Sequence, residues 1–398
     1  MTETPTRART AVAAAFLTQG LVFISLTTRL PDFSDRWDLS DLDLSLLLLM
    51  MVLLAGVGSV VAETLAKRHS SATLLRVGLG LVTVGVPVIA TAPAAAVFVA
   101  GLAVYGVGLG VVDATTNMQA VALEHVYARP ILPSFHGAWT LGGIIGAAIT
   151  LATADLPLSA TALLAVVPLV VLAAPFLPRD HGPTETAQAV AVPWHPILLV
   201  GLGMVLFYMV DTAAATWGPT YLDHTFSTPS GLVALATFPY LVASGALRLA
   251  GDGLVARYGA VRVLRVGALV GSASLAVVVF APTWPVAVLG FTLLGAGVAV
   301  IAPLSFSAAA RIAGGEGLDP AVRQARVDAV IARFNQFNYV GALLGAVLTG
   351  LVGSGSLRVG FAVPMVLILG ILPLARAFAP TSGDGLSGPR PSGVESAS

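Results

Sequence analysis

Four polar side chains interrupt two apolar runs between residues 101 and 147. Asp113 and Asn117 lie one helical turn apart in the first run, and His136 and Trp139 lie at the start of the second. Carboxylate and imidazole groups can exchange protons, and ionisable groups inside span-length apolar segments mark ion pathways more often than they serve packing. Two interpretations stay open: a polar network that locks helix ends, or a gate at which Asp113 and His136 exchange a proton. The distance of these groups from the middle of their runs slightly favours the network.

A fifth polar side chain, Asp211, lies within one turn of the middle of the apolar run 197–221. A charge at that depth costs roughly 2.5–3.5 kcal/mol, and no basic residue at matching depth is evident in the sequence. Desolvation then favours the protonated carboxyl group. We predict that Asp211 either carries the coupling proton or binds a cationic substrate. The alternative is a permanently protonated aspartate that hydrogen-bonds a neighbouring helix.

The composition places these groups in a membrane protein. Hydrophobic residues make up 57% of the 398 residues and charged residues 10%, with a mean hydropathy of +0.91. A net charge of zero argues against nucleic-acid binding, and the absence of cysteine excludes thiol chemistry. The single lysine, Lys67, is not in a P-loop, and the six histidines contain no i, i+4 pair. We expect no cofactor and no metal. Glu124, His125 and His136 come nearest to a catalytic cluster, but an enzyme is much less favoured than a transporter.

Apolar runs long enough to cross a bilayer recur along the whole chain. A cleaved signal peptide does not explain the first run, because it is too long and no small-residue cleavage pattern follows. The acidic segment 29–43 is predicted to be an external loop. The twelve predicted spans are 10–28, 45–65, 73–92, 94–118, 133–154, 158–177, 197–221, 230–251, 262–281, 285–309, 329–352 and 358–379.

The basic residues predict the orientation. With the amino terminus inside, only Arg29, Arg36 and Arg358 fall outside, and most of the other basic residues face the cytoplasm. We therefore place both termini in the cytoplasm of a bacterium, with the chain in the plasma (inner) membrane.

The two halves of the sequence repeat each other. Gly56 and Gly245 are 189 residues apart, and the same shift matches the segments 75–78 and 264–267. Further along, Phe135 and Phe334 are 199 residues apart. Each shift crosses six spans, so the halves share one orientation and are related by an axis along the membrane normal. The predicted organisation is an all-α protein of two parallel six-helix halves, 1–178 and 197–380, with a linker at 179–196 and a disordered cytoplasmic tail at 381–398.

Two loop motifs carry a family resemblance. The segment GDGLVARYGAVR (251–262) follows the eighth span and the degenerate AETLAKRHSSAT (62–73) follows the second. Together with the two parallel halves they resemble the major facilitator superfamily. GVGLGVVDATTNMQAVALEH followed by FHGAWTLGGIIGA is similar to its bacterial fucose-permease-like and rhizopine-transport-like branch. The resemblance implies a cytoplasmic latch formed by Glu63 with Arg68 and by Asp252 with Arg257. The first copy is less certain, since Ala62 and Ser70 stand where the second copy has Gly251 and Gly259.

The resemblance also implies that spans one, four, seven and ten line a substrate cavity. Ordinary packing remains the alternative for each aromatic, and an interfacial position is favoured for Trp217. The predicted cavity and gate residues are Gln19, Tyr105, Asn117, Tyr208, Trp217, Ser305, Asn335 and Asn338.

The resulting prediction is a monomeric secondary active transporter that moves a small polar organic solute, sugar or polyol-like, by alternating access with proton coupling. No span of the first half holds an arginine near its middle, which disfavours phosphate or dicarboxylate substrates. Two alternatives stay open: a proton-driven efflux pump for a drug or secondary metabolite, and a non-transporting membrane sensor. The short polar tails argue against the sensor.

Overall fold

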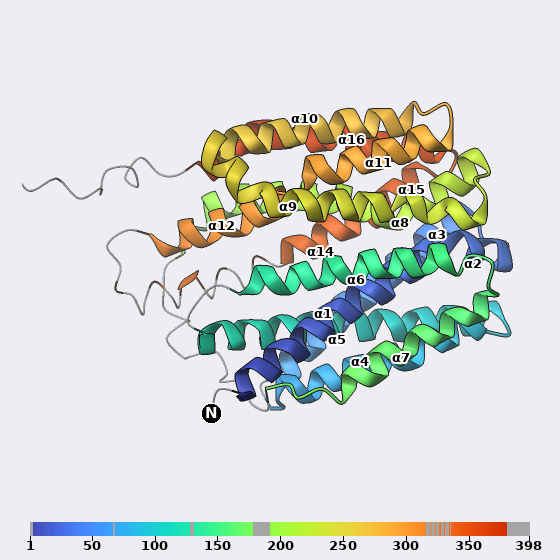
Figure 1. Cartoon of the computed structure of the whole chain (residues 1–398), viewed down its shortest axis with the longest axis horizontal. Helices are drawn as coiled ribbons and strands as arrows, with labels where there is room; N and C mark the ends of the chain where they lie inside the picture. Colours follow the sequence, from blue (N-terminus) through green and yellow to red (C-terminus); the bar gives the residue numbers. More distant parts are fainter. Residues whose placement is uncertain are drawn as a thin grey trace, which may run out of the picture.

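The described part of the chain is a bundle of helices that run along one long axis (Figure 1). The computed structural model describes residues 3–66, 68–127, 131–177, 192–315 and 336–379, together with positions 319, 323, 326, 327, 330 and 334. Across those residues the regular elements are all helical. The predicted linker (from residue 179 to residue 191) and the predicted tail 381–398 lie outside the described residues.

The first half of the chain forms one side of the bundle. Its elements are α1 (Glu3–Thr28), α2 (Leu30–Trp37), α3 (Asp41–Leu65), α4 (Ser71–Thr91), α5 (Ala95–Tyr127), α6 (Leu132–Ala152), η1 (Leu158–Ala165) and α7 (Val166–Leu172). Helix α4 packs along α5, α1 along α6, and α3 along α5.

The second half forms the other side. Its elements are α8 (Trp194–Phe226), η3 (Ser230–Ala236), α9 (Phe238–Tyr258), α10 (Ala260–Val279), α11 (Trp284–Val298), α12 (Ile301–Gly314), α14 (Gln336–Leu343), η4 (Leu344–Leu348), α15 (Thr349–Val352), α16 (Leu357–Leu367), η5 (Ile368–Gly370), α17 (Ile371–Leu374) and η6 (Ala375–Phe378). Helix α10 packs along α11, and α11 along α9.

The described helices confirm the predicted spans. Ten are long and apolar enough to cross a membrane, and two shorter apolar helices, Leu158–Leu172 and Gln336–Val352, bring the total to the twelve predicted. Two spans are less regular than expected. The sixth begins as a 3₁₀ helix, and the eleventh changes from α to π geometry at Leu344.

The acidic segment 29–43 differs from the predicted loop. It contains the short helix α2, which starts with Pro31 in its first turn and buries Leu30 and Phe33. Proline is pre-organised for that position because the first-turn N–H has no helical partner. Ser40 then caps α3 reciprocally with Asp43, so the next span begins at Asp41. The period of the buried residues, rather than the charge, decides the local structure here.

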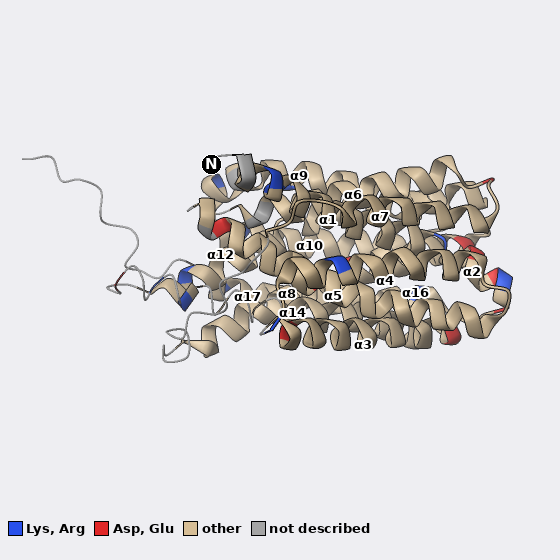
Figure 2. Ribbon diagram, turned by 90° about the horizontal axis from the view of Figure 1, so that it is seen from below, with Lys and Arg blue, Asp and Glu red and all other residues tan. Residues whose placement is uncertain are grey.

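Charged residues gather at the two ends of the bundle, and few mark its middle (Figure 2). We call the end at which α1 begins and α5 ends the basic end. The opposite end, where α2 lies and α3 begins, carries the acidic segment, and we call it the acidic end.

Packing distances confirm the internal repeat. A Cβ at Gly106 of α5 would lie 2.9 Å from the carbonyl oxygen of Met51, and a Cβ at Gly295 of α11 would lie 2.2 Å from that of Tyr240. Both members of this pair are 189 residues from their counterparts. The two halves therefore use the same glycine to bring the same pair of helices together.

Candidate functional site

Asp113 joins three helices near the basic end. Its Oδ1 accepts a hydrogen bond of 3.2 Å from Nε2 of Gln19 on α1. Its Oδ2 accepts one from the hydroxyl of Tyr339 on α14, which belongs to the other half. Asn117 donates to the backbone carbonyl of Asp113 at 2.9 Å and so supports the helix that carries it. The carboxyl group is thus shared between the two halves.

A second contact between the halves lies on the other side of the bundle. Arg248 of α9 donates from Nη1 to the hydroxyl of Thr140 on α6 at 3.0 Å. Tyr339 correspondingly lies against Ser59 of α3. The two contacts are symmetric: Ser59 and Arg248 are 189 residues apart, and Thr140 and Tyr339 are 199 apart, the two shifts of the sequence repeat. The halves therefore meet at equivalent places on both sides.

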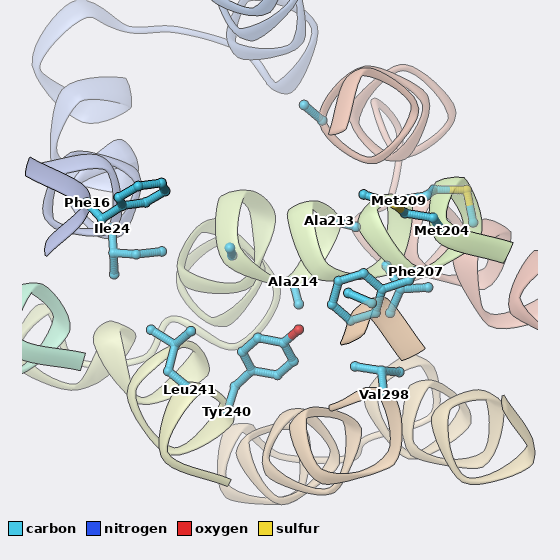
Figure 3. Close-up of a cluster of buried hydrophobic side chains, with 14 of the residues drawn as sticks. Phe16, Ile24, Met204, Phe207, Met209, Ala213, Ala214, Tyr240, Leu241 and Val298 are labelled. Carbon is cyan, nitrogen blue, oxygen red and sulfur yellow. The ribbon is translucent and has the colours of Figure 1, made fainter. Parts of the chain in front are cut away.

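Asp211 lies within the second half. Its Oδ1 accepts a hydrogen bond from the hydroxyl of Tyr240 on α9. Figure 3 shows the ring of Tyr240 with its hydroxyl turned towards α8, among apolar side chains such as Phe207 and Leu241. Tyr240 is fully buried. The partner of Asp211 thus belongs to the same half, unlike the partners of Asp113.

Arg248 corrects one expectation from the sequence. It lies within electrostatic reach of Asp211, so Asp211 does have a basic neighbour. The residue sits two turns along α9 from Tyr240, and its long side chain brings the guanidinium back towards the centre of the bundle. Its Nε donates at 3.1 Å to the carbonyl of Ala299, in the break between α11 and α12. A helix break frees carbonyl groups that a cation can bind.

Tyr208 connects the two aspartates electrostatically. It is within reach of Asp211, Asp113 and Arg248, and its half-buried ring packs edge-on to Phe207 with centroids 5.0 Å apart. This position agrees with its predicted place in a central cavity, although the contact itself names no ligand.

A chain of aromatic rings crosses between the halves near the basic end. His136 packs against Phe16 of α1, with ring centroids 5.4 Å apart, and against Phe306 of α12, 6.1 Å apart. Phe306 in turn packs against Phe334 at 5.3 Å. His136 therefore belongs to an aromatic contact between halves. Its ring meets these side chains, whereas Asp113 is bonded to Gln19 and Tyr339, so the structure does not bring together the two groups predicted to exchange a proton.

Two other predicted cavity residues use their polar groups for packing. Trp217 is fully buried and donates from Nε1 to the carbonyl of Ala346 at 2.7 Å, inside the π-helical turn. It is therefore not at the interface of the membrane, where the sequence favoured it. The hydroxyl of Ser305 donates to the carbonyl of Ile301 on its own helix at 2.8 Å. These bonds satisfy both side chains without a ligand.

The predicted latch is not closed in this structure. Glu63 and Arg68 are both exposed, and among the ion pairs of the described side chains none joins them. Arg257 lies over the ring of Tyr258 at 5.3 Å. Exposed charges gain little from pairing, because water screens them. The side chain of Asp252 and the whole of Asn335 lie outside the described residues, so the latch stays a prediction.

The remaining predicted positions lie in the first half and on α14. Asn338 is half-buried on α14. Gln19 and Tyr105 are buried and border a small cavity between α1, α4 and α5. Within the described ranges, no three His, Asp or Glu side chains are close enough together to hold a metal ion.

At the acidic end, the halves meet through a charged contact. Nδ1 of His224, near the end of α8, is 2.9 Å from Oδ1 of Asp41 at the start of α3. Close packing accompanies it, since a Cβ at Gly350 would overlap the side chains of Ser45 and Trp217. Contacts between halves are therefore present at both ends of the bundle.

Two parallel halves of apolar helices, joined by polar contacts near the centre, define a polytopic membrane transporter of the two-half type. Residues 199–397 match the Major Facilitator Superfamily. The chain belongs to this superfamily, whose members are transporters and not enzymes.

Relatives and solved structures agree with that assignment. The chain is 26% identical to an uncharacterized MFS-type transporter of Yersinia pestis over 91% of this chain and 94% of the relative. It is 27% identical to membrane protein MosC of Rhizobium meliloti over 76% and 75%. Among solved structures, the nucleoside transporter NupG has a TM-score of 0.67 at 13% identity, covering 93% of this chain and 98% of NupG. The fucose:proton symporter FucP of E. coli has a TM-score of 0.59 at 16% identity, covering 94% and 98%. At these identities the structures show the fold alone.

Sequence reasoning missed three residues of this site: Tyr240, Arg248 and Tyr339. Arg248 was visible as an arginine within a span, but its depth seemed too close to the span's inner end. A usable signal exists in the repeat, because the 189-residue shift carries Ser59 onto Arg248 and the 199-residue shift carries Thr140 onto Tyr339. Positions that are polar in both copies of a span are candidates for contacts between halves.

Proposed function

We propose that this transporter moves a small polar organic solute, sugar or polyol-like, across the plasma (inner) membrane, driven by the proton gradient. Alternating access would come from rocking of the two halves about the contacts at Ser59–Tyr339 and Arg248–Thr140. The arginine distribution supports an assignment of the basic end, with both termini, to the cytoplasm.

One observation carries this proposal: two span carboxyl groups, Asp113 and Asp211, are each hydrogen-bonded to a tyrosine hydroxyl. A tyrosine hydroxyl can donate to a carboxylate and can also accept from a protonated carboxyl group. Such a pair accommodates either protonation state without losing its hydrogen bond. That property suits a group that gains and loses a proton in each cycle.

The two carboxyl groups take different roles in the proposal. Asp211 carries the proton, because its partner Tyr240 moves with it and the bond can persist in every state. Asp113 holds the basic end closed, because opening that end separates it from Tyr339. Arg248, within electrostatic reach of Asp211, favours release of the proton once the substrate has moved.

The substrate class rests on the central side chains and on the neighbours. Tyr208, Asp211 and Arg248 offer hydroxyl, carboxyl and guanidinium groups that bind polyhydroxylated solutes. FucP and NupG, whose titles name a fucose symporter and a nucleoside transporter, share the fold.

The test is a ligand thermal-shift screen on purified protein with monosaccharides, polyols and nucleosides as probes. Any probe that stabilises the protein is then followed in proteoliposomes with and without an imposed pH gradient. We expect accumulation of the probe only with the gradient. Equal flux with and without the gradient would contradict proton coupling, and gradient-driven exit of the probe would instead favour an efflux pump.

A further inference from the structure

A small cavity in the first half contains two polar atoms without a partner. The cavity measures about 10 Å³ and lies between α1, α4 and α5. Gln19 and Tyr105 both border it, and both are buried. Neither the Oε1 atom of Gln19 nor the hydroxyl of Tyr105 has a hydrogen-bond partner among the described residues. The other amide atom of Gln19, Nε2, is already bonded to Asp113.

The chemistry of these two atoms defines what could fill the space. An amide oxygen only accepts hydrogen bonds, whereas a phenol hydroxyl can donate or accept. Leaving either unpaired in an apolar interior costs about 1–3 kcal/mol. One molecule that both donates and accepts would satisfy the two atoms together. A buried water needs roughly 10–15 Å³ and at least two polar partners, so the cavity fits water and excludes a larger solute.

We propose that this cavity is a binding site for one water molecule that bridges the hydroxyl of Tyr105 and Oε1 of Gln19. The bridge extends the hydrogen bonds at Asp113 into a chain of Tyr105, water, Gln19, Asp113 and Tyr339. The water fixes the Gln19 amide in the orientation that keeps Nε2 on the carboxyl group. Tyr105 is then a positioning residue for Asp113. Only this last role rests on the proposed function, since the water site itself does not depend on transport.

A neighbouring cavity provides a contrast within the same half. It measures about 30 Å³ and also borders Tyr105, but the rest of its lining is almost wholly apolar, with side chains such as Phe23 and Met51. The hydroxyl of Thr27, the other polar side chain there, already bonds to the carbonyl of Ile24. Apolar cavities stay dry even when they are large enough for water. Hydration is therefore confined to the smaller cavity.

The experiment is X-ray radiolytic labelling of the purified full chain, in which bound water generates hydroxyl radicals that oxidise adjacent side chains. Tyr221 is the matched control: it is as buried as Tyr105, but its hydroxyl donates to the carbonyl of Val278 at 2.6 Å. We expect Tyr105 to be oxidised several-fold faster than Tyr221. Equal rates would overturn the proposal. No substrate is needed, so a negative result here is separate from any failure of the transport proposal.

Two variants identify the source of the labelling. Gln19→Leu removes the acceptor and should slow oxidation of Tyr105 to the rate of Tyr221. Thr18→Val is the control, because Thr18 borders the same cavity but its hydroxyl is bonded to the carbonyl of Ala14 at 2.8 Å. It should leave the fast rate unchanged. Persistent fast oxidation in Gln19→Leu, or an equal loss in Thr18→Val, would show that Gln19 does not hold the water.

Discussion

Asp113 and Asp211 are both carboxyl groups inside spans, and each is bonded to a tyrosine. Tyr339 reaches Asp113 from the other half of the molecule, 226 residues away, whereas Tyr240 reaches Asp211 from the next span of the same half, 29 residues away. A bond between halves must break when they separate. A bond within one half can survive the whole cycle. The comparison teaches that similar local chemistry serves gating at one site and proton carriage at the other.

The largest effect is expected from Asp211→Asn. The amide cannot carry a proton between states, so gradient-driven accumulation should disappear while exchange of substrate across the membrane persists. Accumulation and counterflow of a substrate found in the thermal-shift screen, measured in the same proteoliposomes, separate the two activities. Loss of binding as well would instead assign Asp211 to recognition of a cationic substrate, and wild-type accumulation would exclude both roles.

A matched pair of tyrosine variants sharpens the comparison. Tyr339→Phe removes a bond to a carboxyl group that crosses between the halves, worth about 1.5–3 kcal/mol, and should raise the open population at the basic end by roughly 10-fold or more. Tyr240→Phe removes the same chemical group within one half and should leave that population unchanged.

The reporter for this pair is a cysteine at Asn117, which is half-buried one turn from Asp113. The native chain contains no other cysteine. Its alkylation rate by a membrane-impermeant reagent reports opening. The same acceleration in both variants would remove the distinction between the two carboxyl groups.

A smaller effect is expected from Phe306→Ala, which removes the contact between the rings of Phe306 and His136. An aromatic pair contributes about 0.5–1.5 kcal/mol beyond its buried area, so alkylation at position 117 should accelerate by roughly 3-fold to 10-fold. Phe207→Ala is the control, since its ring packs on Tyr208 within the second half. If it accelerates alkylation equally, general loosening of the bundle is the cause.

The smallest effect is expected from Glu63→Gln at the predicted latch. The side chain is exposed and the structure does not pair it with Arg68, so its contribution to closure in this state is at most about 1 kcal/mol. The alkylation rate should stay within roughly 5-fold of wild type. A larger change would mean that the latch forms in the state that dominates in solution.

The sequence predicted most of the fold because its signals are long. Apolar runs of span length and two constant shifts are enough to place twelve spans in two halves. The helix α2 was missed because five aspartates in 29–43 dominate a segment whose buried side chains are few. Irregular turns such as the 3₁₀ start of the sixth span depend on packing, which a hydropathy pattern does not contain.

The candidate site was only partly predictable. Asp113, Asp211 and His136 stood out because polar groups are rare in spans. Their partners did not, since Tyr240 and Tyr339 have an apolar ring that packing alone explains. Whether a partner belongs to the same half or the other depends on helix rotation, and a fraction of a turn in α14 would place Tyr339 elsewhere.

The most direct test of the account measures the distance between halves at the basic end without a substrate. Spin labels at Gly137 of α6 and Gly253 of α9 suit this, since an added side chain meets no atom within 4 Å at either position. Pulsed electron-electron resonance then compares wild type, Asp113→Asn and Asp211→Asn. The account predicts a longer-distance population in Asp113→Asn and a wild-type distribution in Asp211→Asn. A longer distance in Asp211→Asn alone, or the same change in both variants, would contradict it.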